Sequence, residues 1–494
     1  MQKGRRCGVL LHPTSLPGAG GIGTLGDNAR LFVDLLAGMG MSWWQVLPLN
    51  PPACGNSPYS AFSAFAGNPL LIDLDTLVHE GDLPRLEYAE AVAEDRVDFG
   101  SLIPSKTRAL HSAAAAFFAS GRTARMEEFW HFCDTTPWLH DYALFMALKQ
   151  RYKGMSWHQW PAAAALLVPE TFEKASVELG SEIGVQKYLQ WQFARQWGHL
   201  RAYAAAQGIA IIGDIPIFVA YDSADVWTNR DIFLLDGHGK PTVMAGVPPD
   251  YFSDTGQLWG NPLYDWDSLA QQGYDWWVER FRYLFSQFDC IRVDHFRGFE
   301  AAWHVPAGHK TAAKGAWVAG PGRRLFDVLI AALGPLPIIA EDLGVITQEV
   351  EALRDSYGFP GMKILQFAFG SGPANAYLPH NHIRHSVVYT GTHDNDTSAG
   401  WYAALSEKER REVRNYLGST GADPAVDLTR AALVSVADTA IIPFQDLLGL
   451  PTSARMNIPG RADGNWEWRF TWDMIDKKLI EHYRRKLELF GRCR

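Results

Sequence analysis

The chain has 494 residues, of which 47% are apolar and 20% charged, and its formal net charge is −9 at pH 7. This acidic balance argues against nucleic acid or an anionic membrane surface as a partner. The five cysteines are odd in number, widely spaced and without a CxxC pattern, so neither a disulfide framework nor a zinc site is expected.

The N-terminal segment does not read as a targeting signal. Its basic residues are followed by only four apolar positions before His12, too few for the apolar part of a signal sequence. No apolar run approaches the length that spans a membrane. A cytoplasmic enzyme is therefore the expectation.

Eight short β-rich runs that end in polar residues recur along the chain, separated by helical stretches. They occupy residues 7–12, 43–49, 208–219, 290–296, 337–344, 362–367, 386–394 and 439–450. Near-continuous apolar strands that alternate with helices predict a parallel sheet covered on both faces, and eight such units predict a closed (β/α)8 TIM barrel of the α/β class. In that fold the chemistry gathers at the carboxyl ends of the strands, where the polar residues stand.

The barrel units are unevenly spaced, which predicts insertions in a single catalytic domain over residues 1–494. Amphipathic patterns predict a mainly helical subdomain, and a segment rich in turn formers predicts a lid or substrate loop. The expected regions are a helical subdomain at 70–205, a lid region at 221–275, a helical insertion at 395–435 and a closing loop and helix at 451–494.

Aromatic residues make up 13% of the chain, with 19 Trp, and many Trp occur in polar loops such as WTNRD, QLWGNPLYDW and GNWEWRF. Exposed aromatic faces bind the apolar CH faces of sugar rings through dispersion and the ring quadrupole. This composition favours a carbohydrate protein.

The stretch CIRVDHF contains charged residues that we expect to take part in catalysis. Strand alternation puts Ile291 and Val293 on one face and Arg292 and Asp294 on the other, which in a barrel faces the axis. The later runs IIAED and THDND add further carboxylates, so three acids from the ends of strands four, five and seven are expected at one mouth: Asp294, Glu341 and Asp394.

Carboxylates held together push their pKa values apart. We expect Arg292 to keep Asp294 ionised, while Glu341, crowded by Asp394 and partly desolvated, keeps its proton. An anionic nucleophile opposite a neutral carboxylic acid is the requirement for glycosidic-bond cleavage with retention.

The strings IRVDHFRGF, IIAEDLG and YTGTHDNDT, in this order, resemble the 4-α-glucanotransferases (amylomaltases or disproportionating enzymes) of glycoside hydrolase family 77, in the α-amylase clan. The segments LHPTSLP, WWQVLPLNP, NSPYSAFSAFAGNPLLIDL, GDIPIFV, GQLWGNPLYDW, MKILQFAF, LPHN and GNWEWR extend the resemblance over nearly the whole chain. It implies a covalent glycosyl-aspartate mechanism that transfers α-1,4-glucan segments to the 4-hydroxyl of an acceptor.

The resemblance also implies a role for each site residue. Asp294 would be the nucleophile, Glu341 the general acid/base and Asp394 the third carboxylate, which distorts the sugar and holds its hydroxyls. The implied substrate-binding residues are Ser57, Tyr59, Asp214, Asp250, Gln257, Trp259, Arg292, His295, Phe367, His393 and Asn465.

One departure from the family pattern follows QFAF. Where relatives often have an acid, this chain reads Gly370, Ser371 and Gly372, so a contact to the acceptor sugar is missing from the expected set. Transfer rather than hydrolysis requires acceptor occupancy and water exclusion, and the composition of residues 247–259 suits a lid that supplies both.

The resemblance implies no cofactor and no metal, and it implies α-1,4-glucans as partners: maltooligosaccharides, starch and glycogen. The oligomeric state stays open. The alternatives are an amylase-type hydrolase and a non-catalytic glucan-binding protein, which would need the aromatic residues but not the acids.

Two further enzyme classes are alternatives to a glucanotransferase. A nicotinamide enzyme would use the GxGxxG match at 18–23, but no tight βαβ unit with a suitably placed acid follows it. A metal-dependent hydrolase would use His12, Asp294, His295 and His393, but no HxH or HExxH spacing is present.

Overall fold

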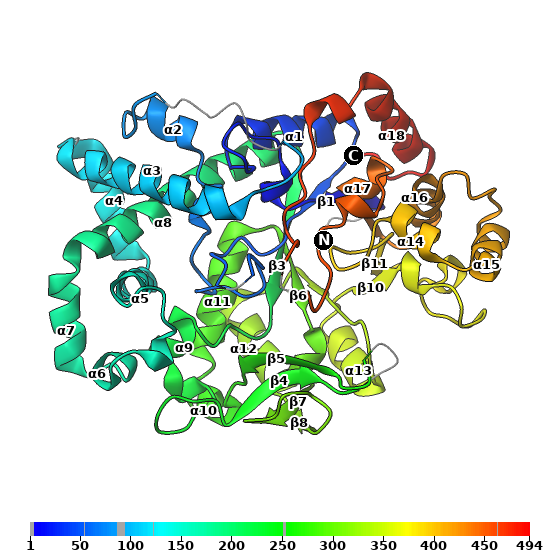
Figure 1. Cartoon of the computed structure of the whole chain (residues 1–494). Coiled ribbons are helices and arrows are strands. Elements are labelled where there is room, and N and C mark those ends of the chain that lie inside the picture. The colour runs from blue at the N-terminus through cyan, green and yellow to red at the C-terminus, as the bar shows by residue number, and fades with distance from the viewer. Residues whose placement is uncertain (1–3, 54, 86–93, 122, 250–252, 462) are drawn as a thin grey trace.

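Eight parallel strands close into a barrel, which confirms the predicted TIM-barrel fold (Figure 1). The computed structural model describes residues 4–53, 55–85, 94–121, 123–249, 253–461 and 463–494. The strands succeed one another around the ring in chain order, and each lies within one of the eight predicted runs, except that the first and the sixth strand begin one residue before theirs. They are β1 (Arg6–Leu10), β2 (Trp43–Gln45), β3 (Ala210–Pro216), β6 (Cys290–Asp294), β9 (Ile338–Ala340), β10 (Gly361–Ile364), β11 (Ser386–Tyr389) and β12 (Thr439–Pro443).

The alternation predicted for the strand of residues 290–294 is present. Ile291 and Val293 are fully buried, whereas Arg292 forms ion pairs inside the ring. Apolar side chains on the outer face give the helices a surface to cover, and this burial is the main favourable contribution to folding. The inner face is left for polar residues that reach the mouth.

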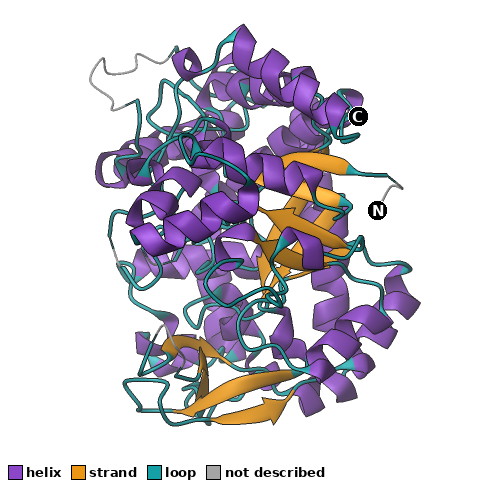
Figure 2. Cartoon of the chain, turned by 90° about the vertical axis from the view of Figure 1, so that its right-hand side faces the viewer, coloured by secondary structure: helices purple, strands orange, loops and turns teal. Residues whose placement is uncertain are grey.

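Helices enclose the barrel on all sides, and Figure 2 shows the strands at the centre of the molecule among them. Among the residues described, no helix combines the length and apolar content needed to cross a membrane. The helices are α1 (Asp27–Gly38), α2 (Leu74–His79), α3 (Phe99–Ala119), α4 (Thr123–Thr135), α5 (Leu139–Arg151), α6 (Ala162–Ala165), α7 (Pro169–Glu178), α8 (Gly180–Ala206), α9 (Ala224–Thr228), α10 (Trp266–Gln271), α11 (Asp275–Gln287), α12 (Arg323–Leu333), α13 (Gln348–Ser356), α14 (Ser398–Ala404), α15 (Glu407–Leu417), α16 (Pro424–Val434), α17 (Phe444–Leu447) and α18 (Lys477–Leu489).

The long helix α8 joins the helical segment of residues 70–205 to the barrel. It packs on α3, α4 and α5 on one side and on α1 and β3 on the other. Arg125 of α4 packs over the Trp191 ring of α8 and donates to Asp82 at 2.6 Å. A buried guanidinium that keeps a carboxylate partner is tolerated in such an interface, whereas an unpaired one would be costly.

A second sheet lies below the barrel, with four antiparallel strands in the order β5-β4-β7-β8 (Figure 2). Its strands are β4 (Val243–Val247), β5 (Gln257–Pro262), β7 (Ala301–Pro306) and β8 (Ala316–Ala319). The sequence analysis expected only a loop over residues 221–275. The strands are short and rich in Gly and Pro, and β4 pairs with β7 far along the chain, so no local pattern announces them.

The C-terminal residues close the seam where β1 meets β12. The guanidinium of Arg492 is fully buried and donates to the carbonyl oxygens of Arg6 at 2.9 Å and Leu433 at 2.8 Å. These bonds tie the end of the chain to its beginning.

Candidate active site

Arg292 lies at the centre of a charged cluster inside the barrel. In the register of β3 and β6 it stands opposite Asp214, and its Nη1 donates to both carboxylate oxygens of Asp214 at 2.8 Å. Its other terminal nitrogen contacts Asp294 at 2.9 Å. Burial lowers the pKa of Arg292, but the two carboxylates outweigh burial and its pKa lies well above the ordinary value. One fixed positive charge therefore holds two acids.

Tyr59 completes the surroundings of Asp214, because its hydroxyl donates to Oδ2 of that carboxylate at 2.8 Å. Burial raises the pKa of Asp214, and the contacts from Arg292 and Tyr59 oppose the rise by stabilising the charged form. Asp214 is thus fixed in place and in turn fixes Arg292.

Glu341 follows β9 directly and lies beside Asp294. The register pairs Val293 with Ala340, so the next step places Asp294 opposite Glu341, and the N–H of Glu341 continues the ladder by donating to Val293 at 3.0 Å. Neighbouring strands lie about 4.8 Å apart, and retaining cleavage needs carboxyl groups about 5–5.5 Å apart. The barrel register thus brings the two side chains to neighbouring positions on adjacent strands.

The carboxyl group of Glu341 is held by two backbone donors, the N–H of His295 at 2.8 Å and that of Leu343 at 3.2 Å. Burial raises its pKa to about 8, and the nearby charge of Asp294 adds to the rise, while Arg292 opposes it. At neutral pH this side chain therefore carries a proton that it can donate.

Of the two causes expected for that rise, burial is confirmed as the larger one and the crowding charge was assigned to the wrong residue. The charge that acts on Glu341 is that of Asp294, with a smaller effect from Asp342, and not that of Asp394. The reason is positional: Asp294 and Glu341 come from adjacent strands, and Asp394 is on a loop two strands further round the ring.

Asp394 lies on the loop after β11, five residues beyond the end of the strand. Its side chain is 48% exposed, and its Oδ1 accepts from Asn457 at 2.6 Å and lies 3.4 Å from Nε2 of His393. The guanidinium of Arg455 donates to its main-chain oxygen at 2.5 Å. Both Asn457 and Arg455 follow the last barrel strand.

Aromatic rings flank the site on this side. Tyr59 stacks on His393 with ring centroids 4.9 Å apart, and Trp466 lies 5.7 Å from the same imidazole. Burial lowers the pKa of His393, and Asp394 only partly offsets this effect. A neutral imidazole packed against two aromatic rings can offer one donor and one acceptor to a sugar hydroxyl.

His295 forms the opposite flank. Its backbone is in the left-handed region with φ of 54°, and the ring of Trp259 meets it edge-on at 4.8 Å. Burial lowers its pKa to about 4. Its Nε2 is buried and has no hydrogen-bond partner among the residues described. A strained residue with an orphaned polar atom is the arrangement expected where a ligand completes the bonding.

The remaining residues predicted to bind substrate are Ser57, Gln257, Phe367, Asn465 and Asp250. Ser57 accepts from the N–H of Tyr59 at 3.4 Å, Gln257 accepts from Trp259 at 3.3 Å, and Phe367 is 40% exposed. Asn465 is buried, and its amide bonds to Ile458 and Arg461 within its own loop, so it shapes that loop. Asp250 lies outside the described residues.

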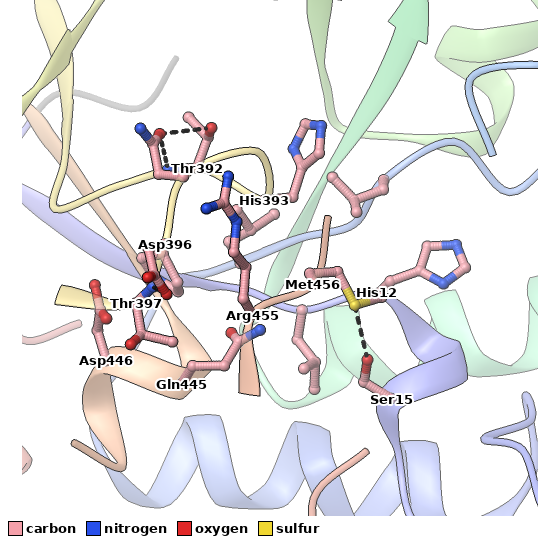
Figure 3. A pocket seen from close by; sticks show the side chains of 15 residues that line it. His12, Ser15, Thr392, His393, Asp396, Thr397, Gln445, Asp446, Arg455 and Met456 are labelled. Atoms are coloured by element: carbon pink, nitrogen blue, oxygen red, sulfur yellow. Dashed lines mark hydrogen bonds between the residues drawn. The ribbon is translucent and has the colours of Figure 1, made fainter. Parts of the chain in front are cut away.

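The sequence analysis missed Arg455 and Asn457. No spacing rule marks them, because they lie in an irregular segment 12 and 14 positions beyond the end of β12 (Thr439–Pro443). A cavity lies between this segment and the ends of β1, β11 and β12, and Figure 3 shows His12, His393 and Arg455 among its lining residues. Only the folded chain brings these residues together.

Two observations on the described residues concern metal ligands and the GxGxxG segment. No group of three or more His, Cys, Asp or Glu side chains among them could hold a metal ion. In the GxGxxG segment a Cβ added at Gly23 would lie 2.0 Å from the carbonyl oxygen of Pro13, and Arg469 donates to Gly18 at 2.8 Å. These glycines serve close packing within their loop.

Comparison with known proteins gives a consistent result. Residues 11–475 match the profile of glycoside hydrolase family 77, described as 4-alpha-glucanotransferase. The chain is 50% identical over 496 residues to a 4-alpha-glucanotransferase from Synechocystis, covering 99% of this chain and 98% of the relative, and 49% identical to one from Thermus thermophilus, covering 95% of each. The crystallised amylomaltase from Streptococcus agalactiae, in complex with acarbose, superposes with a TM-score of 0.96 at 37% identity, covering 99% of this chain and 100% of that one.

Proposed function

The chain belongs to glycoside hydrolase family 77, the 4-alpha-glucanotransferases, and from this premise we propose how its side chains carry out the transfer. The reaction moves an α-1,4-glucan segment from a donor to the 4-hydroxyl of an acceptor glucan or of glucose. The observation that carries the mechanism is the pair on adjacent strands: Asp294 paired with Arg292, beside Glu341 with its raised pKa.

In the first half-reaction the donor linkage lies between the two carboxyl groups. Glu341 gives its proton to the glycosidic oxygen while an oxygen of Asp294 attacks the anomeric carbon from the opposite face. The C–O bond to the leaving chain breaks, a bond to Asp294 forms, and the leaving chain departs with the proton as a free 4-hydroxyl.

In the second half-reaction Glu341 is ionised and acts as the base. It takes the proton from the acceptor 4-hydroxyl as that oxygen attacks the anomeric carbon, and the bond to Asp294 breaks. Two inversions at one carbon give net retention. Glu341 is protonated again and the enzyme is ready for another donor.

The surrounding groups orient these two acids and the sugar. Arg292, itself fixed by Asp214, holds the carboxyl group of the nucleophile and directs it at the mouth. His295 and His393, both neutral at pH 7, would bond the sugar hydroxyls from opposite sides, and Asp394 would hold two hydroxyls and favour the distorted ring. Tyr59 and Trp259 present aromatic faces to the ring.

Donors and acceptors are proposed to be maltooligosaccharides, starch and glycogen. The partly exposed rings of Trp259 and Phe367 support a linear glucan, because exposed aromatic faces suit successive sugar rings. The segment between β4 and β5 is proposed as the lid that excludes water from the intermediate; its residues 250–252 lie outside the described part of the chain.

Incubation with maltotriose tests the proposal. Transfer gives a ladder of longer oligomers together with free glucose, resolved by anion-exchange chromatography. Glucose and maltose alone would mean that water is the acceptor, and the transfer reaction would then be rejected in favour of hydrolysis.

A further inference from the structure

The loop of residues 390–398, here called the Asp394 loop, is held in place by residues that follow the last barrel strand. Asp446 of α17 accepts from the N–H of Ser398 at 2.7 Å, from its hydroxyl at 2.6 Å and from the hydroxyl of Thr390 at 2.5 Å. Both ends of the loop are therefore tied to one buried carboxylate.

A second set of contacts acts on Asp394 itself. Arg455 donates through Nη2 to its main-chain oxygen and through Nε to the oxygen of Asn457, at 2.5 and 2.7 Å. The N–H of Asn457 donates to the oxygen of His393 at 3.2 Å. In Figure 3 the side chain of Arg455 extends along the pocket toward the loop that bears Thr392 and His393.

The side-chain amide of Asn457 makes the decisive contact, because Nδ2 donates to Oδ1 of Asp394 at 2.6 Å. The only other group of the described residues recorded against that oxygen is Nε2 of His393, at 3.4 Å. An aspartate that is half exposed on a loop is otherwise free to rotate about χ1, and freedom of this kind is lost each time it binds substrate.

We propose that Asn457, supported by Arg455, is a positioning residue for the transfer reaction: it fixes the carboxylate of Asp394 toward the sugar before substrate arrives. This inference rests on the proposed role of Asp394. Preorganised groups act because their orientation costs nothing at the moment of reaction, and small misplacements are expensive.

Two variants test the contact. Asn457→Ala removes the donor and is expected to lower kcat for maltotriose by about 10- to 100-fold, the value of one hydrogen bond to a charged group, with KM little changed. Asn457→Asp puts a second carboxylate at the same place, and at neutral pH the repulsion should cause a loss at least as large.

The pH dependence of Asn457→Asp separates positioning from a structural role. Two carboxylates about 2.6 Å apart share one proton in acid, and the protonated aspartic acid then donates to Asp394 as the amide does. The activity of this variant relative to the unaltered enzyme should therefore rise as pH falls from 7 to 5. Among the described residues, the other titratable or charged groups beside Asp394 are His393, Tyr59 and Arg455, and all three are present in each enzyme compared.

Asn28→Asp is the matched control, because it adds the same charge where the Asn oxygen only accepts from Trp472. It should leave kcat and its pH profile unchanged. Three outcomes would each overturn the proposal. The first is an activity of Asn457→Asp, relative to the unaltered enzyme, that stays constant with pH. The others are undiminished activity in either Asn457 variant and an unfolding midpoint more than about 10 °C below that of the unaltered enzyme.

The variant Asp394→Asn tests the proposed role of Asp394 separately from the inferred role of Asn457. If Asp394→Asn is inactive while both Asn457 variants are fully active, the positioning role is wrong and the role of Asp394 stands. If Asp394→Asn is fully active, the proposed role of Asp394 itself is wrong, and with it the inference about Asn457.

Discussion

Two parts of the barrel mouth present carboxylates by different means. On the side of β3, β6 and β9, Asp214 lies within β3 and Asp294 and Glu341 stand at the ends of the next two strands, where the hydrogen-bonded register alone sets which side chains are neighbours. On the side of β11, Asp394 lies on a loop and is held by Asn457, 63 positions later in the chain. The first arrangement comes from the barrel itself, whereas the second depends on a segment outside it.

This difference suggests a division of work. The groups proposed to make and break bonds occupy the rigid side, where Arg292 and two backbone N–H groups fix them, and the group proposed to hold the sugar occupies the side that a later segment adjusts. Rigid elements give the most accurate placement, so the nucleophile and the acid gain most from them. The predictions below test each side, from the largest expected effect to the smallest.

Asp294→Asn should have the largest effect. An amide oxygen cannot replace the anionic nucleophile, so kcat for maltotriose disproportionation should fall by roughly 10⁴-fold or more. Calorimetric titration with a maltooligosaccharide should still show binding. Substantial residual transfer, above about 1% of the original rate, would contradict the role of Asp294 and favour a protein that needs its aromatic residues but not its acids.

Glu341→Gln should lower kcat by about 10²- to 10⁴-fold, since it removes the proton donor. In the unaltered enzyme the pKa of about 8 predicts that activity falls as pH rises through that value, because the acid form of Glu341 is then lost. The pH profile of kcat/KM measures this limb. If kcat/KM of Glu341→Gln still falls over the same pH range, a group other than Glu341 causes that fall.

Arg292→Lys sharpens the comparison on the rigid side. Lysine keeps the positive charge but cannot bridge Asp214 and Asp294 with two terminal nitrogens, so kcat should fall by about 10- to 100-fold. Arg485→Lys, at an exposed position paired with Glu481, is the matched control and should behave as the unaltered enzyme. Equal kinetics in the two variants would mean that charge alone orients the nucleophile.

Trp259→Ala should have the smallest effect. The ring packs edge-on against His295 and is 39% exposed, and such aromatic contacts contribute about 0.5–1.5 kcal/mol, or about 2- to 10-fold in KM. Trp130→Ala removes an exposed Trp from α4 and serves as the control. Initial rates over a range of maltotriose concentrations distinguish the two, and identical KM values would exclude Trp259 from the substrate groove.

The sequence by itself determined the barrel and the identity of the paired acids. Alternating and continuous apolar runs are local signals, and each of the eight runs overlaps one barrel strand. A charged residue that follows such a run must stand at the mouth, because all the strands of a closed parallel barrel end on the same side. For this reason Arg292, Asp294 and Glu341 could be named from their strands alone.

Only the tertiary structure decided the contacts between residues that lie far apart in the sequence. The second sheet pairs β4 with β7, the pKa of Glu341 responds to Asp294 instead of Asp394, and Asn457 reaches Asp394 from beyond the last strand. Contacts between distant, irregular segments have no periodicity, because they are chosen by the packing of the whole chain. Which group holds a side chain is therefore settled only when the chain has folded.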